Sequence, residues 1–255
     1  MSAERAAARS PAPVPAPVAA DIGIVAAMSI EVGFLLDRFR RVRRYAGPKY
    51  EVIEGELGGK LVALVVGGMG RSAAHAACEV MLTGHRPRVI VSAGFAGALD
   101  PALRRYDALF PREVLDLEGH RFEVESVDKE NASATPRRLL TVDTIVRTAS
   151  EKAELRARFG ADAVDMETSA LAMLCLGRGV RFVPVRVVGD EAGVDLPKEV
   201  LDLMTRTGSY RVGAAVRAVW NRPSSLKDLW ALHEHALRAA DRLAEVTAGL
   251  ISRLD

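Results

Sequence analysis

Two carboxylates stand in a stretch of sequence that otherwise looks like protein core. Asp165 and Glu167 lie two positions apart in VDMETSALA (164–172), and the nearest basic residues along the chain are Arg158 and Arg178. Ionised Asp and Glu are almost never fully buried without partners. Burial changes how easily a carboxyl group releases its proton, so such acids can serve in proton transfer or in ligand binding. The alternative is a solvated helix N-terminus, where the helix dipole favours acids; for Asp165 we expect an outward-facing cap.

Two further acids follow apolar runs. Asp190 ends the predicted buried strand RFVPVRVVGD (181–190), and Glu31 lies in the first turn of the helix expected after DIGIVAA (21–27). A carboxyl group buried at a strand end can stay protonated near neutral pH, as a general acid requires. The structural alternatives are that Asp190 caps the turn after its strand and that Glu31 is a surface acid.

Glycines mark two places where backbone approaches something closely. VVGGMGRSA contains the pattern G-x-G-x-x-A (Gly68, Gly70, Ala73) between a strand and a helix, which is the form of a dinucleotide-binding fingerprint. The acidic residue expected about 20 positions later is missing, so we predict a turn that brings backbone amides close to some other ligand. SAGFAGALDP, with Gly94 and Gly97, is predicted to be a second turn at the end of a strand.

Composition excludes several classes of protein. The chain has 255 residues, a formal net charge of +2 and 49% hydrophobic residues, which is typical of a globular protein and not of a nucleic-acid binder. Cys78 and Cys175 lie in apolar helical patterns and are interpreted as reduced core residues of a cytoplasmic protein. No metal-binding spacing is found among the cysteines and the five histidines, which we expect to be structural or exposed; these are His75, His85, His120, His233 and His235.

The remaining patterns predict one α/β domain. No long uncharged apolar run is present, so no integral membrane segment is expected, and the Pro- and Ala-rich residues 1–20 are predicted to be a disordered tail. Apolar strands alternate with helices over 21–255, and a helical extension is expected over about 198–255. The predicted fold has three layers, α/β/α, with a central mixed, mostly parallel sheet. The basic cluster within 38–44 is interpreted as a solvated end of a helix that begins near Ser29.

Four segments, in this order, resemble one known family: IGIVAAMSIEV (22–32), VGGMGRSAA (66–74), SAGFAGALDP (92–101), and VDMETSALA (164–172) followed by VPVRVVGD (183–190). Together they are similar to the purine nucleoside phosphorylase/uridine phosphorylase superfamily, and within it most similar to the methylthioadenosine/S-adenosylhomocysteine nucleosidases. The resemblance covers about residues 21 to 195. It implies a phosphorylase-like fold, cleavage of the N-glycosidic bond of an adenine nucleoside by water, and no metal or organic cofactor.

The resemblance also implies roles for individual residues. Asp190 matches the general acid that protonates purine N7, and Glu31 matches the carboxylate that activates the attacking water. Glu167 matches the carboxylate that hydrogen-bonds the ribose hydroxyls. The residues expected to line the ribose, the base and the 5′-substituent are Met166, Met28, Met69, Phe95, Ala96, Gly97, Ile145 and Val146. Cleavage of a glycosidic bond needs such a pair of an acid and a second carboxylate.

Three departures from the family pattern affect the site. Gly189 stands where the nucleosidases usually have a serine that could orient the following Asp, Phe95 stands where a small or polar residue is usual, and residues 111–140 are short and polar. A phosphate-dependent phosphorylase is therefore kept as an alternative, with Arg71 or Arg104 as the phosphate ligand. Since phosphate must be held by several donors or cations and the phosphorylase arginine motifs are missing, water is the favoured nucleophile.

The C-terminal segment supports a variant of that alternative. It resembles the tail of hopanoid-associated nucleoside phosphorylases, which act on an adenosyl-hopane, and apolar residues that could line a lipid-tolerant groove are Trp220, Leu226, Leu229 and Trp230. A pair of helices that covers the core or packs against another subunit is the simpler interpretation. A non-catalytic nucleoside-binding protein is a third possibility, although a binder has no need of all three acids. By resemblance alone we expect a homodimer.

Overall fold

The computed structural model describes residues 18–47, 49–125, 137–197 and 225–254. The first half contains β1 (Ile22–Ala26), α1 (Ser29–Leu36), β2 (Arg40–Ala46), β3 (Glu51–Leu57), β4 (Lys60–Val66), α2 (Arg71–Gly84) and β5 (Val89–Ala98). The second half contains β6 (Ala108–Leu109), β7 (Glu113–Asp116), β8 (Arg121–Glu123), β9 (Arg138–Thr141), α3 (Ala149–Phe159), β10 (Ala163–Asp165), α4 (Thr168–Gly177), β11 (Arg181–Asp190) and α7 (Ser225–Arg253). Most of tail 1–20, the segment 126–136 and residues 198–224 lie outside the described residues, as do the side chains of 225–232.

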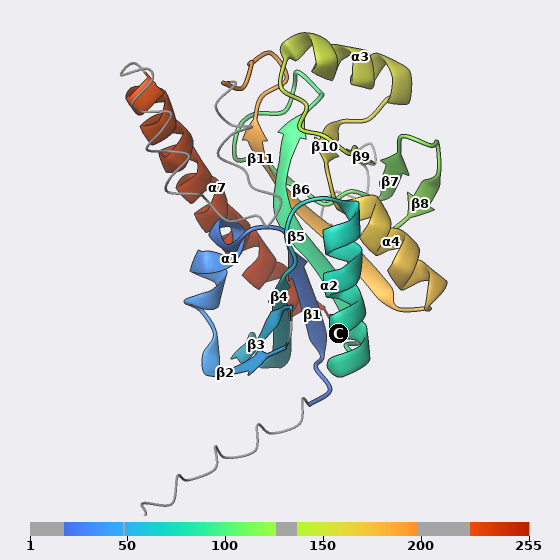
Figure 1. Ribbon diagram of the computed structural model, residues 1–255, viewed down its shortest axis with the longest axis vertical. Coiled ribbons are helices and arrows are strands. Elements are labelled where there is room, and N and C mark those ends of the chain that lie inside the picture. The colour runs from blue at the N-terminus through green and yellow to red at the C-terminus, as the bar shows by residue number, and fades with distance from the viewer. Residues whose placement is uncertain (1–17, 48, 126–136, 198–224, 255) are drawn as a thin grey trace, which may run out of the picture.

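The expected mixed sheet with helices on both faces is confirmed. Its strand order is β2-β3-β4-β1-β5-β10-β9-β7-β8, with β11 added beside β5 and β6 beside β11. The centre is parallel, since β1 pairs with β4 and β5, and β5 pairs with β11, while β2-β3-β4 and β7-β8 are antiparallel. Helices α1 and α7 cover one face, and α2 and α4 cover the other (Figure 1). None of the helices in the described part of the chain is both long and apolar enough to span a membrane.

The alternation of side chains along the central strands fills a separate core on each face. Ile22 and Ile24 of β1 pack toward α1 and α7, whereas Val25 packs toward α2 and α4. Cys78 and Cys175 are buried in the second core with their Sγ atoms 3.8 Å apart, as unpaired cysteines. The central strands β1, β5 and β11 are therefore covered by packed side chains on both faces.

The predicted helix over the basic cluster is wrong. Helix α1 ends at Leu36, and residues 40–46 form the edge strand β2, which pairs with β3. Phe39 fits the helical spacing, but its buried ring lies against Gly55 of β3, where any Cβ would come within 2.5 Å of the ring. The arginines are exposed on β2, and Arg41 and Arg44 pair with Glu56 and Glu51 of β3. Charged side chains on an edge strand discourage pairing with other chains.

The glycine-rich turn predicted at Gly94 and Gly97 is instead a continuation of strand β5. The strand runs to Ala98, but its neighbour changes on one side: β1 pairs with it only as far as Ser92, and β10 pairs with it only from Gly97. Backbone groups between these two points, including the amide of Phe95, are left free of strand pairing on that side. This interruption of the sheet is where the candidate site lies.

Candidate active site

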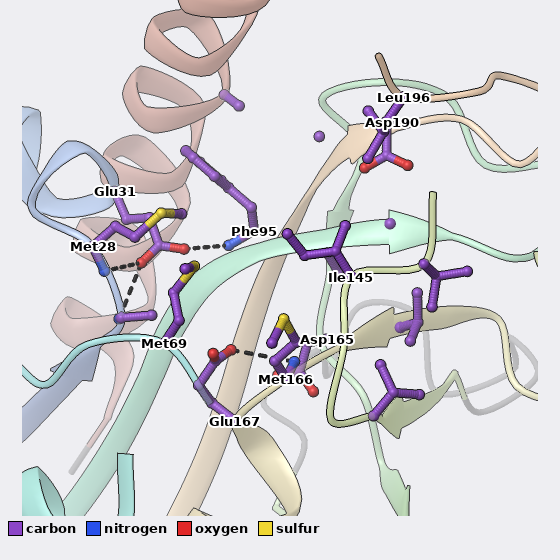
Figure 2. A pocket seen from close by; sticks show the side chains of 18 of the residues that line it. Met28, Glu31, Met69, Phe95, Ile145, Asp165, Met166, Glu167, Asp190 and Leu196 are labelled. Carbon is purple, nitrogen blue, oxygen red and sulfur yellow. Dashed lines mark hydrogen bonds between the residues drawn. The ribbon is translucent and has the colours of Figure 1, made fainter. Parts of the chain in front are cut away.

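One cavity contains every site residue predicted from the sequence. Its empty volume is about 1140 Å³ including the open mouth, and it lies where β1 leaves β5. The predicted residues that line it are Asp190, Glu31, Glu167, Met166, Met28, Met69, Phe95, Ala96, Gly97, Ile145 and Val146. Figure 2 shows Glu31 and Asp190 at opposite ends of this cavity, with Glu167 and Met166 between them, below the ribbon of β5 in this view.

Glu31 is held by the free backbone at the break in the sheet. Its Oε2 accepts hydrogen bonds from the amides of Ala27 (3.1 Å) and Met28 (2.8 Å), and its Oε1 accepts one from Phe95 (2.9 Å). Burial raises the pKa of this carboxyl group, while the three amides and the charge of Arg186 oppose the rise. A carboxylate has about four acceptor positions. Three are taken here, so one remains to receive a proton from a ligand in the cavity.

The G-x-G-x-x-A segment holds a carboxylate of the chain itself. Gly70, at the N-cap of α2, has φ of 90°, a conformation that side-chain-bearing residues rarely adopt. Its amide donates to Glu167 Oε1 at 2.7 Å, and the amide of Met166 donates to Oε2 at 3.3 Å. Burial and the charge of Asp165 raise the pKa of Glu167. Two acceptor positions of this carboxyl group remain for hydroxyl groups of a ligand.

Asp165, two residues before Glu167, has a structural role. The expectation that it is an outward-facing cap is wrong. Asp165 is buried and forms an ion pair with Arg186 of β11 at 2.8 Å, and it accepts hydrogen bonds from both hydroxyls of Thr141 and Thr168. Arg186 in turn donates to the carbonyl and the hydroxyl of Ser92. The network fixes β10 against β5 and β11, directly behind the two glutamates.

Asp190 reaches the cavity through a β-bulge. The pairing of β11 with β5 shifts between Val188 and Asp190, so that Gly189 and Asp190 together face Gly97. A bulge of this kind re-aims a side chain, and bulges are common beside active sites. Gly97 leaves room for the acid, since a Cβ there would lie 3.3 Å from Asp190 Oδ2. Burial raises the pKa of Asp190, and the charge of Lys152, whose Nζ lies 2.6 Å from Oδ2, opposes this rise.

Sequence reasoning missed several residues of the site, including Thr144 and Leu196 of the lining and three basic side chains in or beside the cavity. Arg186 left a signal, because an arginine inside a continuous apolar strand calls for a buried acid. Lys152 left none, since it lies in the otherwise polar helix α3. His235 of α7 lines the cavity and contacts the Tyr106 hydroxyl through Nδ1, although the histidines were expected to be structural or exposed.

Neither of the arginines considered as phosphate ligands lines the cavity. Arg71 makes four hydrogen bonds of 2.9 to 3.0 Å to Glu118 and Asp143, which raise its pKa further. Arg104 is largely exposed and lies 4.0 Å from Glu191. Among the described residues, the lining of the cavity includes no lysine or arginine at all.

One cluster of possible metal ligands lies outside the cavity. Asp116, Glu118 and His120 of the β7–β8 hairpin have ligand atoms close together. Glu118 is occupied by Arg71, and Asp116 binds the Nδ1 and backbone amide of His120. These contacts account for the cluster without an ion.

The fold and the cavity define an α/β protein with a carboxylate-lined site at a break in its central sheet. The family model for the phosphorylase superfamily matches residues 21–139 and 125–252, and the chain belongs to this superfamily. It is 27% identical over 197 residues to a 5′-methylthioadenosine/S-adenosylhomocysteine nucleosidase of Baumannia cicadellinicola, a match that covers 67% of this chain and 86% of the relative.

Solved structures of nucleosidases have the same fold. The nucleosidase from Neisseria meningitidis, in complex with methylthio-immucillin-A, superimposes with a TM-score of 0.70 at 20% identity, covering 91% of this chain and 99% of that one. The nucleosidase from Colwellia psychrerythraea, in complex with adenine, superimposes with a TM-score of 0.61 at 25% identity, covering 69% and 84%.

Proposed function

We propose that the protein is a nucleosidase that hydrolyses the N-glycosidic bond of adenine nucleosides of the 5′-methylthioadenosine and S-adenosylhomocysteine type and releases adenine. The observation that carries the proposal is the placement of Glu31 and Asp190 at opposite ends of one cavity, with Glu167 between them. The nucleosidases among its relatives support the choice of substrate class.

In this mechanism the two end acids have different tasks because their surroundings differ. Glu31 accepts three amide hydrogen bonds, which favour its ionised form, so it takes the proton from a water that attacks the sugar carbon. Asp190 accepts no backbone hydrogen bond among the described residues and has a raised pKa, so it carries the proton to purine N7. Pairs of acids whose environments separate their protonation states are typical of glycosidic bond cleavage.

Glu167 and the apolar lining position the nucleoside. The two free acceptor positions of Glu167 suit the two ribose hydroxyls, and Met166, from the same turn, packs against the sugar. Ile145 and Val146 flank the purine, while Met28, Met69 and the residues of β5 surround the sugar and its 5′-substituent. Tight positioning of this kind contributes substantially to rate, since a misplacement of about 1 Å can cost roughly 10²-fold.

Water is a better nucleophile for this cavity than phosphate. A buried phosphate needs several donors or cations. Arg71 is engaged by carboxylates, Arg104 is exposed, and the described lining has neither lysine nor arginine. The adenosyl-hopane alternative rests on side chains outside the described residues. A homodimer, a cytoplasmic location and a place in methionine salvage are further parts of the proposal, which rest on the resemblance.

The test is adenine release, followed by chromatography, from methylthioadenosine, S-adenosylhomocysteine and adenosine. The wild-type protein should release adenine, and Glu31→Gln should lose most of this activity because an amide cannot accept the proton of water. Glu56→Gln, the same substitution in the exposed ion pair with Arg41 on the edge strands, is the matched control and should retain activity. Absence of adenine from all three substrates would refute the proposal.

A further inference from the structure

A lysine is the most completely buried charged side chain next to the cavity, and the proposed mechanism leaves it without a task. Lys152 is 0% exposed and is the only buried residue of helix α3. Buried lysines are rare unless they are paired. Its Nζ donates to the carbonyls of Glu191 (2.7 Å) and Val194 (2.9 Å), and it lies 2.6 Å from Asp190 Oδ2. The ammonium group thus donates hydrogen bonds to two carbonyl oxygens and forms an ion pair with the carboxyl group of Asp190.

The two carbonyl contacts alone would suggest that Lys152 only anchors the loop 191–197 to helix α3. That loop, however, is already attached to the start of α3 by other bonds. The amide of Ala149 donates to Asp195 Oδ1 at 2.8 Å, and Leu196 and Arg147 exchange two further hydrogen bonds. The loop therefore has anchors that do not involve the lysine.

The carboxyl group of Asp190, in contrast to the loop, has no second set of hydrogen bonds to hold it. Among the described residues no hydroxyl or backbone amide donates to its carboxyl group, and both of its close neighbours on the sheet, Gly189 and Gly97, lack a side chain. Within the described part of the chain, Lys152 is the only side chain that forms an ion pair with this acid. We propose that Lys152 is the positioning residue for Asp190, holding its carboxyl group at the cavity and controlling when it gives up its proton.

The chemistry explains why a positive charge is needed there; this step rests on the proposed function. When Asp190 donates, its O–H bond breaks and an N7–H bond forms, while the electron pair of the glycosidic bond goes to the purine. The electrons of the O–H bond stay on Asp190 as a buried carboxylate, which is costly without a partner. The Lys152 ammonium compensates this new charge at 2.6 Å.

Other charged groups near Asp190 are few. Arg105, from the segment between β5 and β6, acts on it at longer range, and its backbone amide donates to Glu191. His235 faces the cavity from α7, where burial and Arg105 lower its pKa. Lys152 is thus the dominant charge opposing burial. Without it the pKa of Asp190 would rise further, and the acid would keep its proton to higher pH.

The decisive experiment compares Lys152→Met and Lys152→Gln with wild type. Adenine release should show a kcat reduced by about 10- to 100-fold, as for a misplaced catalytic group, with KM little changed. In the plot of rate against pH, activity should be lost at a higher pH than in wild type, because activity requires protonated Asp190 and the variant acid keeps its proton longer. Lys152→Arg should restore part of the rate and the profile. Lys60→Met, on the distant strand β4, is the matched control and should leave both unchanged.

Lys152→Gln guards against a folding defect. The Gln amide can still donate a hydrogen bond to a carbonyl of the loop. The substitution therefore removes the charge but keeps an anchor for the loop. If the folded Gln variant has the same pH dependence of adenine release as wild type, the proposal is overturned and Lys152 only anchors the loop. Carbon-13 NMR of the aspartate carboxyl groups, with the Asp190 signal assigned through Asp190→Asn, gives a readout independent of turnover. If the wild type releases no adenine, the proposed function fails. The positioning role of Lys152 is still tested, because it requires a higher pKa of Asp190 in Lys152→Gln than in wild type.

Discussion

Gly94→Ala should disable the site through a single added methyl group. A Cβ at position 94 would lie 2.9 Å from Oε1 of Glu31, closer than real Cβ atoms come to their neighbours. Ordinary contact begins near 3.4 Å, so the carboxyl group must retreat by about 0.5 Å. The hydrogen bond from the Phe95 amide, now 2.9 Å, then stretches beyond normal length.

The magnitude follows from these distances. Since a shift of about 1 Å can cost roughly 10²-fold in rate, half that shift predicts a kcat/KM reduced by about 10-fold or more. The lost bond to a charged group costs about 1.5–3 kcal/mol of stability. Replacing Gly by Ala restricts the unfolded chain and returns about 0.4–1 kcal/mol. The expected net loss is on the order of 1–2 kcal/mol, measurable by denaturant unfolding.

Gly189→Ala provides the matched control. It lies on β11 in the same site, but a Cβ there meets nothing closer than 3.9 Å, so activity should change less than about twofold. The two variants should be assayed together for adenine release and for unfolding. Full activity of Gly94→Ala would refute the placement of Glu31 as the group that activates water, because the carboxyl group cannot stay where it is.

The remaining predictions concern the other acids. Asp190→Asn should lose about 10²–10⁴-fold in turnover while calorimetry shows nucleoside affinity within a few-fold; unchanged turnover would exclude it as the proton donor. Asp165→Asn leaves the Arg186 charge buried without its partner and should cost about 3–5 kcal/mol in denaturant unfolding, against about 0–1 kcal/mol for the exposed pair at Glu56. Because the pKa of Glu31 is raised above 4.5 and its ionised form is the active one, kcat/KM should increase with pH through a midpoint above that value; a lower midpoint would contradict its role.

The residues of the cavity could be identified from the sequence because they lie in short ordered motifs at strand ends. Glu31 and Asp190 lie just after or at the carboxyl ends of β1 and β11, which run parallel to β5, and parallel strands bring these ends to one edge of a sheet. Glu167 follows β10, which runs antiparallel to β5, so its place depended on the motif and not on this rule. The sequence could not show that β5 continues past Gly94, since glycine-rich sequence also suits a turn. Continuation depends on β11, which pairs with the strand from Val89 to Gly97 through residues 92 or more positions later in the chain.

Long-range partners account for the other errors. The same spacing in 29–42 suits a helix or a turn into a strand, and the choice depends on room for the Phe39 ring above Gly55. Asp165 was taken for a surface cap because Arg186, its partner, is 21 residues away along the chain. Lys152 and Asp190 likewise meet only in three dimensions. Interactions between charged groups on different elements were thus the least predictable part of the site.

The nucleophile is the central point, and phosphate dependence tests it most directly. Adenine release from methylthioadenosine should be measured in phosphate-free buffer and again with added phosphate, with the sugar product analysed in both. The arrangement of Glu31 opposite Asp190 predicts equal rates and free sugar in both buffers. Release that requires phosphate and yields a sugar 1-phosphate would contradict it and would make the protein a phosphorylase.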